Sequence, residues 1–338
     1  MKKILLLIGI VIIIVCAITM KADTVKIEGL TIEKLDKISA YKIVYKNDYK
    51  FDEFLETGSS DDNELYEYLE NNGFHPHKRI MNTGDLFGCT CFTVKNAKDE
   101  VLFGRNFDWY SHPCTLVYTS PAGAYSSVSM VDLYYTGVNK YLFWNGAVTN
   151  EHLLSVPYIP LDGVNECGVA IGVMSVPKAE SSNDFSKKTI SSLGAVRLVL
   201  DYAANVDEAI YLMSKYNIYF QKTPIHYMIS DSSGKSVIVE YVEGKMNILE
   251  NKELWQVSTN FVLSGYDSIG RGQDRYKLAE QNLKDTYLSI TKSNAMDILN
   301  NVSQGSYTIW SIVYDLRKKD FDLCINGNYS KVYHSCLN

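Results

Sequence analysis

The sequence Phe87-Gly88-Cys89-Thr90-Cys91-Phe92, followed by Phe103-Gly104-Arg105-Asn106-Phe107-Asp108-Trp109, is the most informative part of this chain. Residues 89–95 and 101–107 are rich in β-branched and aromatic side chains, and the polar residues 96–100 lie between them, which predicts a β-hairpin. In such a hairpin Cys89 begins one strand, while Arg105 and Asp108 end its neighbour. The hairpin would therefore bring a thiol, a guanidinium and a carboxylate to one edge of a sheet.

These three groups indicate nucleophilic catalysis. A thiol attacks as the thiolate, which a neighbouring cation such as Arg105 favours. Cleavage of the Gly88–Cys89 bond would free an α-amine, whose ordinary pKa of about 7.7–8 suits a general base. Asp108 would hold that amine, and nucleophile and base would belong to one residue. Gly88 would permit the strained backbone that self-cleavage by the Cys89 thiol requires.

The spacing of these residues resembles the choloylglycine hydrolase family, which contains bile salt hydrolases and penicillin V acylases. It also resembles the related acyl-CoA:6-aminopenicillanate acyltransferase and acid-ceramidase-like amidases. In that superfamily a new N-terminal Cys is followed after sixteen residues by Arg and after nineteen by Asp, as Cys89 is by Arg105 and Asp108. The segments 162–168, 257–260, 274–276 and 308–315 resemble further family motifs. The resemblance covers the chain from Cys89 to its end.

The resemblance implies an N-terminal-nucleophile (Ntn) hydrolase fold, which is α+β and built as a four-layer αββα sandwich. It also implies that Asn260 forms part of the oxyanion hole and that Arg275 is a second active-site arginine. No cofactor is expected. Trp109 and Tyr110, which follow the motif directly, are candidates for the wall of the acyl pocket.

Two features depart from the bile salt hydrolases. Ser175 stands where those enzymes have an Asn that helps to stabilise the oxyanion, which weakens a bile-salt interpretation. The long segment before Cys89 fits relatives that excise a true propeptide, so the amidase and acyltransferase branches are favoured. Cys91 is a rival nucleophile, although its spacing to Arg105 and Asp108 is two residues too short.

The expected reaction is hydrolysis of a linear carboxamide in a small N-acyl amide through a thioester on Cys89. Two alternatives stay open. One is an acyltransferase that moves an acyl group from a thioester donor to an amine. The other is a non-catalytic, membrane-anchored binding protein with the same fold. Neither alternative requires a metal, and the chain could form a homo-oligomer.

Three regions follow from the sequence: a signal peptide or membrane anchor at 1–23, a helical leader or propeptide at 24–88, and the catalytic domain at 89–338. Lys2 and Lys3 precede an apolar run over residues 4–20, which predicts export of everything beyond it. The run is long for a signal peptide and short for a membrane span. Cys16 offers a third possibility, a lipid anchor, for which Val15 is a poor preceding residue.

Composition excludes other classes of function. The net charge is −6 and no Lys/Arg cluster is present, which argues against nucleic acid. The seven cysteines lack C-x-x-C spacing and the six His are scattered, so no metal site is expected. The 25 Tyr and four Trp indicate either β-sheet packing or a pocket for apolar substrates.

Periodicity beyond the hairpin predicts strand groups that alternate with helix pairs, hence an α+β fold. Further strands are expected at 115–119, 127–135, 169–174, 226–230, 236–242, 254–258, 308–314 and 321–325. Helices are expected at 64–69, 191–204, 206–216, 275–284 and 293–302.

Overall fold

The computed structural model of the chain describes residues 24–27, 29–36, 39–74, 76, 88–149, 152–181, 183–220, 223–265 and 270–337. The expected signal or anchor at residues 1–23 lies outside these ranges. Within them, no helix is both long and apolar enough to cross a membrane.

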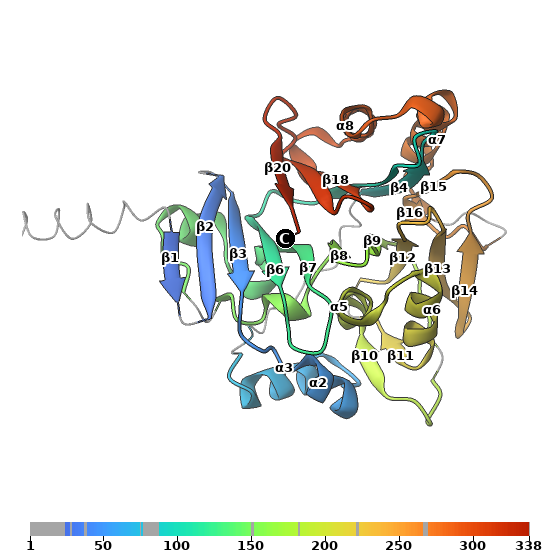
Figure 1. Cartoon of the computed structure of the whole chain (residues 1–338). Helices are drawn as coiled ribbons and strands as arrows, with labels where there is room; N and C mark the ends of the chain where they lie inside the picture. Colours follow the sequence, from blue (N-terminus) through green and yellow to red (C-terminus); the bar gives the residue numbers. More distant parts are fainter. Residues whose placement is uncertain are drawn as a thin grey trace, which may run out of the picture.

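Two large sheets form the centre of the molecule (Figure 1). The larger sheet has ten strands, in the order β1 (Thr24–Ile27), β2 (Leu30–Asp36), β3 (Ala40–Tyr45), β6 (Cys114–Thr119), β7 (Ser127–Asp132), β8 (Asp162–Asn165), β9 (Ala170–Ser175), β12 (Ile225–Ser230), β13 (Ser236–Val242) and β14 (Lys245–Glu250). The smaller sheet has six, in the order β15 (Trp255–Ser258), β4 (Cys89–Lys95), β5 (Val101–Asp108), β18 (Thr308–Asp315), β19 (Asp320–Ile325) and β20 (Tyr333–Cys336). Two strand pairs stand apart: β10 (Thr189–Ser191) with β11 (Asn217–Tyr219), and β16 (Asn260–Phe261) with β17 (Gly270–Arg271).

Helices cover the outer face of each sheet, which gives four layers. α5 (Ser192–Tyr202) and α6 (Val206–Ser214) pack on the ten-stranded sheet, and α7 (Gln273–Thr286) and α8 (Lys292–Asn301) on the six-stranded one (Figure 1). The shorter helices are α2 (Phe51–Thr57), α3 (Asp62–Asn71), α4 (Lys140–Trp144), η1 (Leu133–Thr136), η3 (Val156–Tyr158), η4 (Tyr287–Ser289) and η5 (Gly305–Tyr307). The mixed α+β prediction is confirmed.

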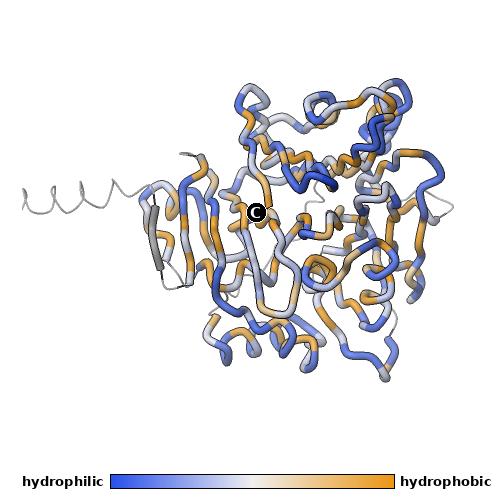
Figure 2. Tube along the Cα trace, in the orientation of Figure 1, coloured by the Kyte–Doolittle hydropathy of each residue, from blue (hydrophilic) through white to orange (hydrophobic). Residues whose placement is uncertain are grey.

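The β4–β5 hairpin is buried on both faces because it lies between the large sheet and the α7–α8 layer. Alternate side chains of a strand point to opposite faces. Cys89 and Cys91 therefore join the core between the sheets, whereas Phe92 and Val94 join the core under α7 and α8. Hydrophobic residues recur along the strands between the layers, and hydrophilic ones dominate the outer loops (Figure 2). The hairpin predicted from the sequence is confirmed.

The segment before Cys89 differs from the predicted helical leader. The helix expected at 64–69 is present as α3, but residues 24–45 form three strands of the ten-stranded sheet, and β3 pairs in parallel with β6. Ala40, Tyr41, Ile43 and Tyr45 are buried, and within this run only Lys42 is charged. The segment is part of the central sheet and more than a helical cap.

Candidate active site

Cys89 is the first residue of β4 and lies at the entrance of the hairpin. It pairs across the ladder with Phe107, while Cys91 pairs with Arg105. The side chain is 3 % exposed and reaches a pocket between the two sheets. The backbone on either side of it is held at three points that belong to different elements. The hairpin therefore delivers the thiol to a cavity and fixes its main chain.

The carbonyl of Gly88, which belongs to the Gly88–Cys89 bond, accepts a hydrogen bond of 3.0 Å from the backbone N–H of Asp108. The expectation that glycine permits a strained backbone here stays a prediction, since φ of Gly88 depends on residue 87, which lies outside the described residues. A Cβ at this position would overlap the side-chain amide of Gln304. That amide is the end of a flexible side chain, so a shift of Gln304 could relieve the overlap.

Asn260 faces the other side of Cys89. Its Oδ1 accepts from the backbone nitrogen of Cys89 at 2.5 Å, and its Nδ2 donates to the carbonyl and hydroxyl oxygens of Ser175 at 2.9 and 3.0 Å. Arg275 donates to Oδ1 of Asn260 at 2.9 Å, to the Cys89 carbonyl at 2.5 Å and to Oγ1 of Thr90 at 2.9 Å. The predicted pair Asn260 and Arg275 thus contacts Cys89 directly.

Asp108 is 1 % exposed, and its carboxylate accepts from Oγ1 of Thr308 at 2.5 Å and from Nε2 of Gln304 at 3.0 Å. Burial raises the pKa of Asp108 above its ordinary value, while these two hydrogen bonds and the charges of Arg275 and Arg105 oppose the rise. The side chain is a buried carboxylate beside the Gly88–Cys89 bond.

Arg105 is fully buried and lies over the ring of Phe107, with 5.5 Å from its guanidinium carbon to the ring centroid. It donates to the sulfur of Cys91 at 3.5 Å, and its Nε lies 3.5 Å from Oδ2 of Asp162. Burial alone would lower the pKa of this guanidinium, but the thiols of Cys89 and Cys91 and the Asp162 carboxylate raise it above the ordinary value. Arg105 is thus a fixed positive charge next to both thiols.

The thiol of Cys91, the alternative nucleophile, lies in a different environment from that of Cys89. Cys91 is fully buried and does not line the pocket. Burial raises the pKa of the Cys91 thiol to about 12, against the lowering effect of Arg105. A thiol in this environment stays protonated near neutrality and is a poor nucleophile.

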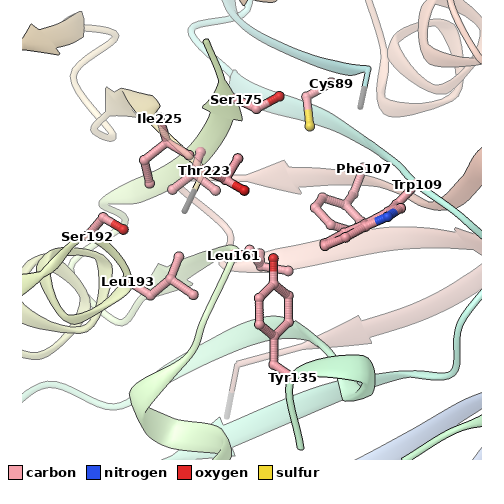
Figure 3. Close-up of a pocket in the computed structure, with 11 residues that line it drawn as sticks. Cys89, Phe107, Trp109, Tyr135, Leu161, Ser175, Ser192, Leu193, Thr223 and Ile225 are labelled. Atoms are coloured by element: carbon pink, nitrogen blue, oxygen red, sulfur yellow. The ribbon is translucent and has the colours of Figure 1, made fainter. Parts of the chain in front are cut away.

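The pocket beside Cys89 is mostly apolar (Figure 3). It encloses about 510 Å³, a volume that includes space open to solvent. Its walls are Phe107, Trp109, Tyr135, Leu161, Val173, Ser175, Ser192, Leu193, Thr223 and Ile225. No charged side chain is among these described residues, so an uncharged acyl group suits it.

Two aromatic predictions have different outcomes. Trp109 is 8 % exposed and lines the pocket, where its ring meets that of Tyr135 edge-on. Tyr110 is 47 % exposed, contacts Tyr307 and is not among the residues that line this pocket, so its role in the acyl site stays a prediction.

Metal and disulfide chemistry find no support in the part of the chain that the structure describes. No group of three or more His, Cys, Asp or Glu side chains is arranged to hold a metal ion there. The cysteines from Cys89 to Cys336 form no disulfide.

Asn165, in the 162–168 motif, has a structural role. Its side-chain amide donates to the carbonyl oxygens of Leu200 and Ala203, and its side-chain oxygen accepts from the backbone N–H groups of Cys167 and Val169.

A family model matches this arrangement. The model for linear amide C-N hydrolases, choloylglycine hydrolase family, covers residues 89–295, which is more than half of the 338 residues. The chain belongs to this family. The match begins at Cys89 itself, and the resemblance drawn from the sequence motifs is confirmed.

Comparison with individual proteins gives the same family, at lower coverage or lower sequence identity. A penicillin V acylase of Pectobacterium atrosepticum is 37 % identical over 111 residues, a stretch that spans only 29 % of this chain and 29 % of that enzyme. The conjugated bile acid hydrolase of Clostridium perfringens, solved as a mutant, superposes with a TM-score of 0.56 at 18 % identity over 74 % of this chain and 92 % of its own. The penicillin V acylase of Agrobacterium tumefaciens gives 0.55 at 21 % identity over 74 % and 86 %. These structures share the Ntn hydrolase fold.

Three side chains of the site were not found from the sequence. Gln304 and Thr308 hold the Asp108 carboxylate, and Asp162 pairs with Arg105. Thr308 and Asp162 both lie in segments that resemble family motifs, so the sequence could have indicated a role in the site for each of them. Gln304 lies in a loop between a helix and a strand, where no spacing rule applies.

Proposed function

We propose that this family member is an exported cysteine amidase that activates itself by cleaving the Gly88–Cys89 bond. One observation carries the proposal: the Cys89 thiol opens onto an apolar pocket while its backbone nitrogen and the preceding carbonyl are each held by a hydrogen bond. The apolar run at residues 4–20 is the basis for export. Residues 24–88 are the leader in this proposal.

Activation begins when Cys89 Sγ attacks the carbonyl carbon of Gly88. The C–S bond forms, the C–N bond breaks, and the nitrogen takes a proton to become the α-amine of Cys89. Water then hydrolyses the thioester, which gives a carboxylate at Gly88 and restores the thiol. The Asp108 N–H, 3.0 Å from the Gly88 oxygen, supports the negative charge that develops there.

Turnover repeats this chemistry on a bound amide. The Cys89 thiolate attacks the substrate carbonyl, and the α-amine carries the thiol proton to the leaving amine. Asn260 Nδ2 points toward Ser175 at the pocket wall, which suits an oxyanion donor. Water then releases the acyl group as a carboxylic acid. Arg105 and Asp108 supply the fixed charges around the thiol and the amine.

The substrates of the relatives define the first assays. The acyl groups of penicillin V and of simple N-acyl amino acids are uncharged and suit this pocket. Conjugated bile acids are a weaker choice because Ser175 replaces the Asn of bile salt hydrolases. An acyl transfer to an added amine would place the protein in the acyltransferase branch. Product analysis with and without an amine acceptor distinguishes the two reactions.

Intact-mass spectrometry and an amide-hydrolysis assay test the proposal on wild type, Cys89→Ala and Cys91→Ala. Wild type and Cys91→Ala should contain a chain of residues 89–338 and release free acid. The Cys89→Ala protein should remain uncleaved between residues 88 and 89 and should be inactive. An uncleaved wild type that binds small amides without turnover would instead establish the non-catalytic binding protein, and an active Cys89→Ala protein would refute the mechanism.

A further inference from the structure

A buried His–Glu pair lies behind the candidate oxyanion residue and outside the pocket. His226 on β12 and Glu240 on the adjacent strand β13 are each 1 % exposed. His226 Nδ1 lies 3.0 Å from Glu240 Oε1. The reaction outlined above uses neither residue. A buried ionisable pair of this kind requires an explanation, because placing two charges in a core is costly.

The pair contacts the chain on both sides of Asn260. On one side, His226 Nε2 lies 2.7 Å from the carbonyl oxygen of Thr259, the residue immediately before Asn260. On the other side, the two carboxylate oxygens of Glu240 accept from the backbone N–H groups of Leu263 and Ser264, each at 2.8 Å. The two-residue strand β16, which begins with Asn260, is therefore clamped at both ends.

The imidazole contacts oxygen atoms through both ring nitrogens. Nδ1 faces the Glu240 carboxylate, and Nε2 lies 2.7 Å from the Thr259 carbonyl oxygen and 3.2 Å from the Ser258 hydroxyl oxygen. The contact with the Thr259 carbonyl is a hydrogen bond when Nε2 carries a hydrogen. Burial raises the pKa of Glu240, but the contacts with His226 and with the two backbone N–H groups outweigh it and lower the pKa overall. The shortest contacts that the pair makes outside itself are with the chain around Asn260.

We propose that His226 and Glu240 are positioning residues that hold the Asn260 carboxamide in place for the reaction. The inference rests on the proposed function, in which Asn260 stabilises the oxyanion. An apolar pair could fill the same volume but could not hold the carbonyl of Thr259 and the N–H groups of Leu263 and Ser264. The His226–Glu240 pair fixes the backbone on both sides of a side chain that a preorganised site must place accurately.

The test is a double-mutant cycle between His226→Gln and Asn260→Ala in the cleaved enzyme, with Glu240→Gln as a second positioning variant. His226→Gln should lower kcat by about tenfold to a hundredfold with little change in KM, because removing an oxyanion donor outright costs about 10²–10³. In the Asn260→Ala background the same substitution should have no further effect on kcat. His334→Gln is the matched control, since His334 also pairs with a carboxylate, Asp322 at 2.7 Å, but is exposed and remote from Cys89.

Two results would overturn the inference. One is an equal loss of kcat from His226→Gln with and without Asn260. The other is a nitrogen NMR spectrum of the wild-type protein in which Nε2 of His226 carries no hydrogen. This measurement does not depend on the folding of any variant. Failure of the proposed function gives a different result: wild type would cleave none of the amides, while Nε2 of His226 would still carry its hydrogen.

Discussion

The backbone nitrogen of Cys89 lies 2.5 Å from Oδ1 of Asn260, although 171 positions separate the two residues in sequence. In the intact chain this nitrogen is an amide, and cleavage before Cys89 would turn it into the proposed base. One carboxamide thus faces both the base, through its oxygen, and the pocket wall at Ser175, through its nitrogen. In the proposed mechanism, Asn260 would therefore take part in both activation and turnover.

The first prediction concerns this carboxamide. Asn260→Ala should lower kcat by about 10²–10³, because a preorganised oxyanion donor is lost, and should slow self-cleavage as well. Steady-state kinetics and the rate of chain cleavage measure the two effects. Asn96→Ala is a matched control: Asn96 is also buried and holds the β4–β5 turn, so its loss should lower thermal stability and leave kcat unchanged. Wild-type kcat in Asn260→Ala would contradict the assignment.

The second prediction concerns Gly88. Gly88→Ala should slow cleavage only modestly, because the added Cβ would overlap the Gln304 side-chain amide, which is the end of a flexible side chain and can shift away. Gln304→Ala alone is the control, and adding it to Gly88→Ala should restore part of the cleavage rate by removing the clash. The ratio of intact to cleaved chain over time gives the answer. Cleavage of Gly88→Ala at the wild-type rate would show that this contact does not matter.

The sequence predicted the elements whose patterns are local. The hairpin that carries Cys89 and Arg105 was found because aromatic and β-branched runs flank a polar turn, and α5 to α8 were found from helical periodicity. The strands β1 to β3 were missed because charged residues interrupt their apolar positions, and the burial of β3 depends on pairing with β6, which lies far along the chain.

The residues of the candidate site also fall into two groups, those that the sequence predicted and those that it did not. Fixed spacing identified Cys89, Arg105 and Asp108, and motif resemblance identified Asn260 and Arg275, all of which lie together. Residues that act through a partner were missed. Gln304 and His226 matter only because of what they touch, and no spacing rule connects them to Asp108 or Asn260.

The third prediction follows from the environment of Asp108. Burial raises the pKa of this carboxyl, and the hydroxyl of Thr308 holds it down. Thr308→Val removes that bond, so the pKa should rise further. Because the ionised form is the one that can hold the Cys89 amine, the acid limb of kcat/KM should move to higher pH. Thr115→Val is the control, since Thr115 is a buried threonine that donates to the Tyr41 carbonyl, and it should leave the pH of the acid limb of kcat/KM unchanged. A shift to lower pH in Thr308→Val would contradict the role of Asp108.

The fourth prediction concerns acyl selectivity. Charged side chains are absent from the described pocket wall, and moving a carboxylate into such a site costs several kcal/mol unless a partner is present. A phenylacetyl amide should therefore exceed a glutaryl amide in kcat/KM by about a hundredfold or more. Leu193→Arg places a cation in the wall and should reverse much of this preference, whereas Leu193→Met should retain it. Equal rates for the two acyl groups in wild type would show that the acyl chain binds elsewhere.

The fifth prediction is that the leader stays bound after cleavage. β3 pairs with β6 inside the ten-stranded sheet, and the buried hydroxyl of Tyr49 donates to both oxygens of Asp201 at 2.8 Å, the carboxylate that also pairs with Arg197 at 3.0 Å. Native mass spectrometry of the cleaved protein should show both segments in one particle, and denaturing conditions should separate them. Tyr49→Phe leaves the buried carboxylate short of a donor and should destabilise the particle by about 1–3 kcal/mol, while Tyr211→Phe, on an exposed ring, should not. Gel filtration that yields an active chain of residues 89–338 without its leader would contradict this, because the strands at the edge of the sheet would then be dispensable.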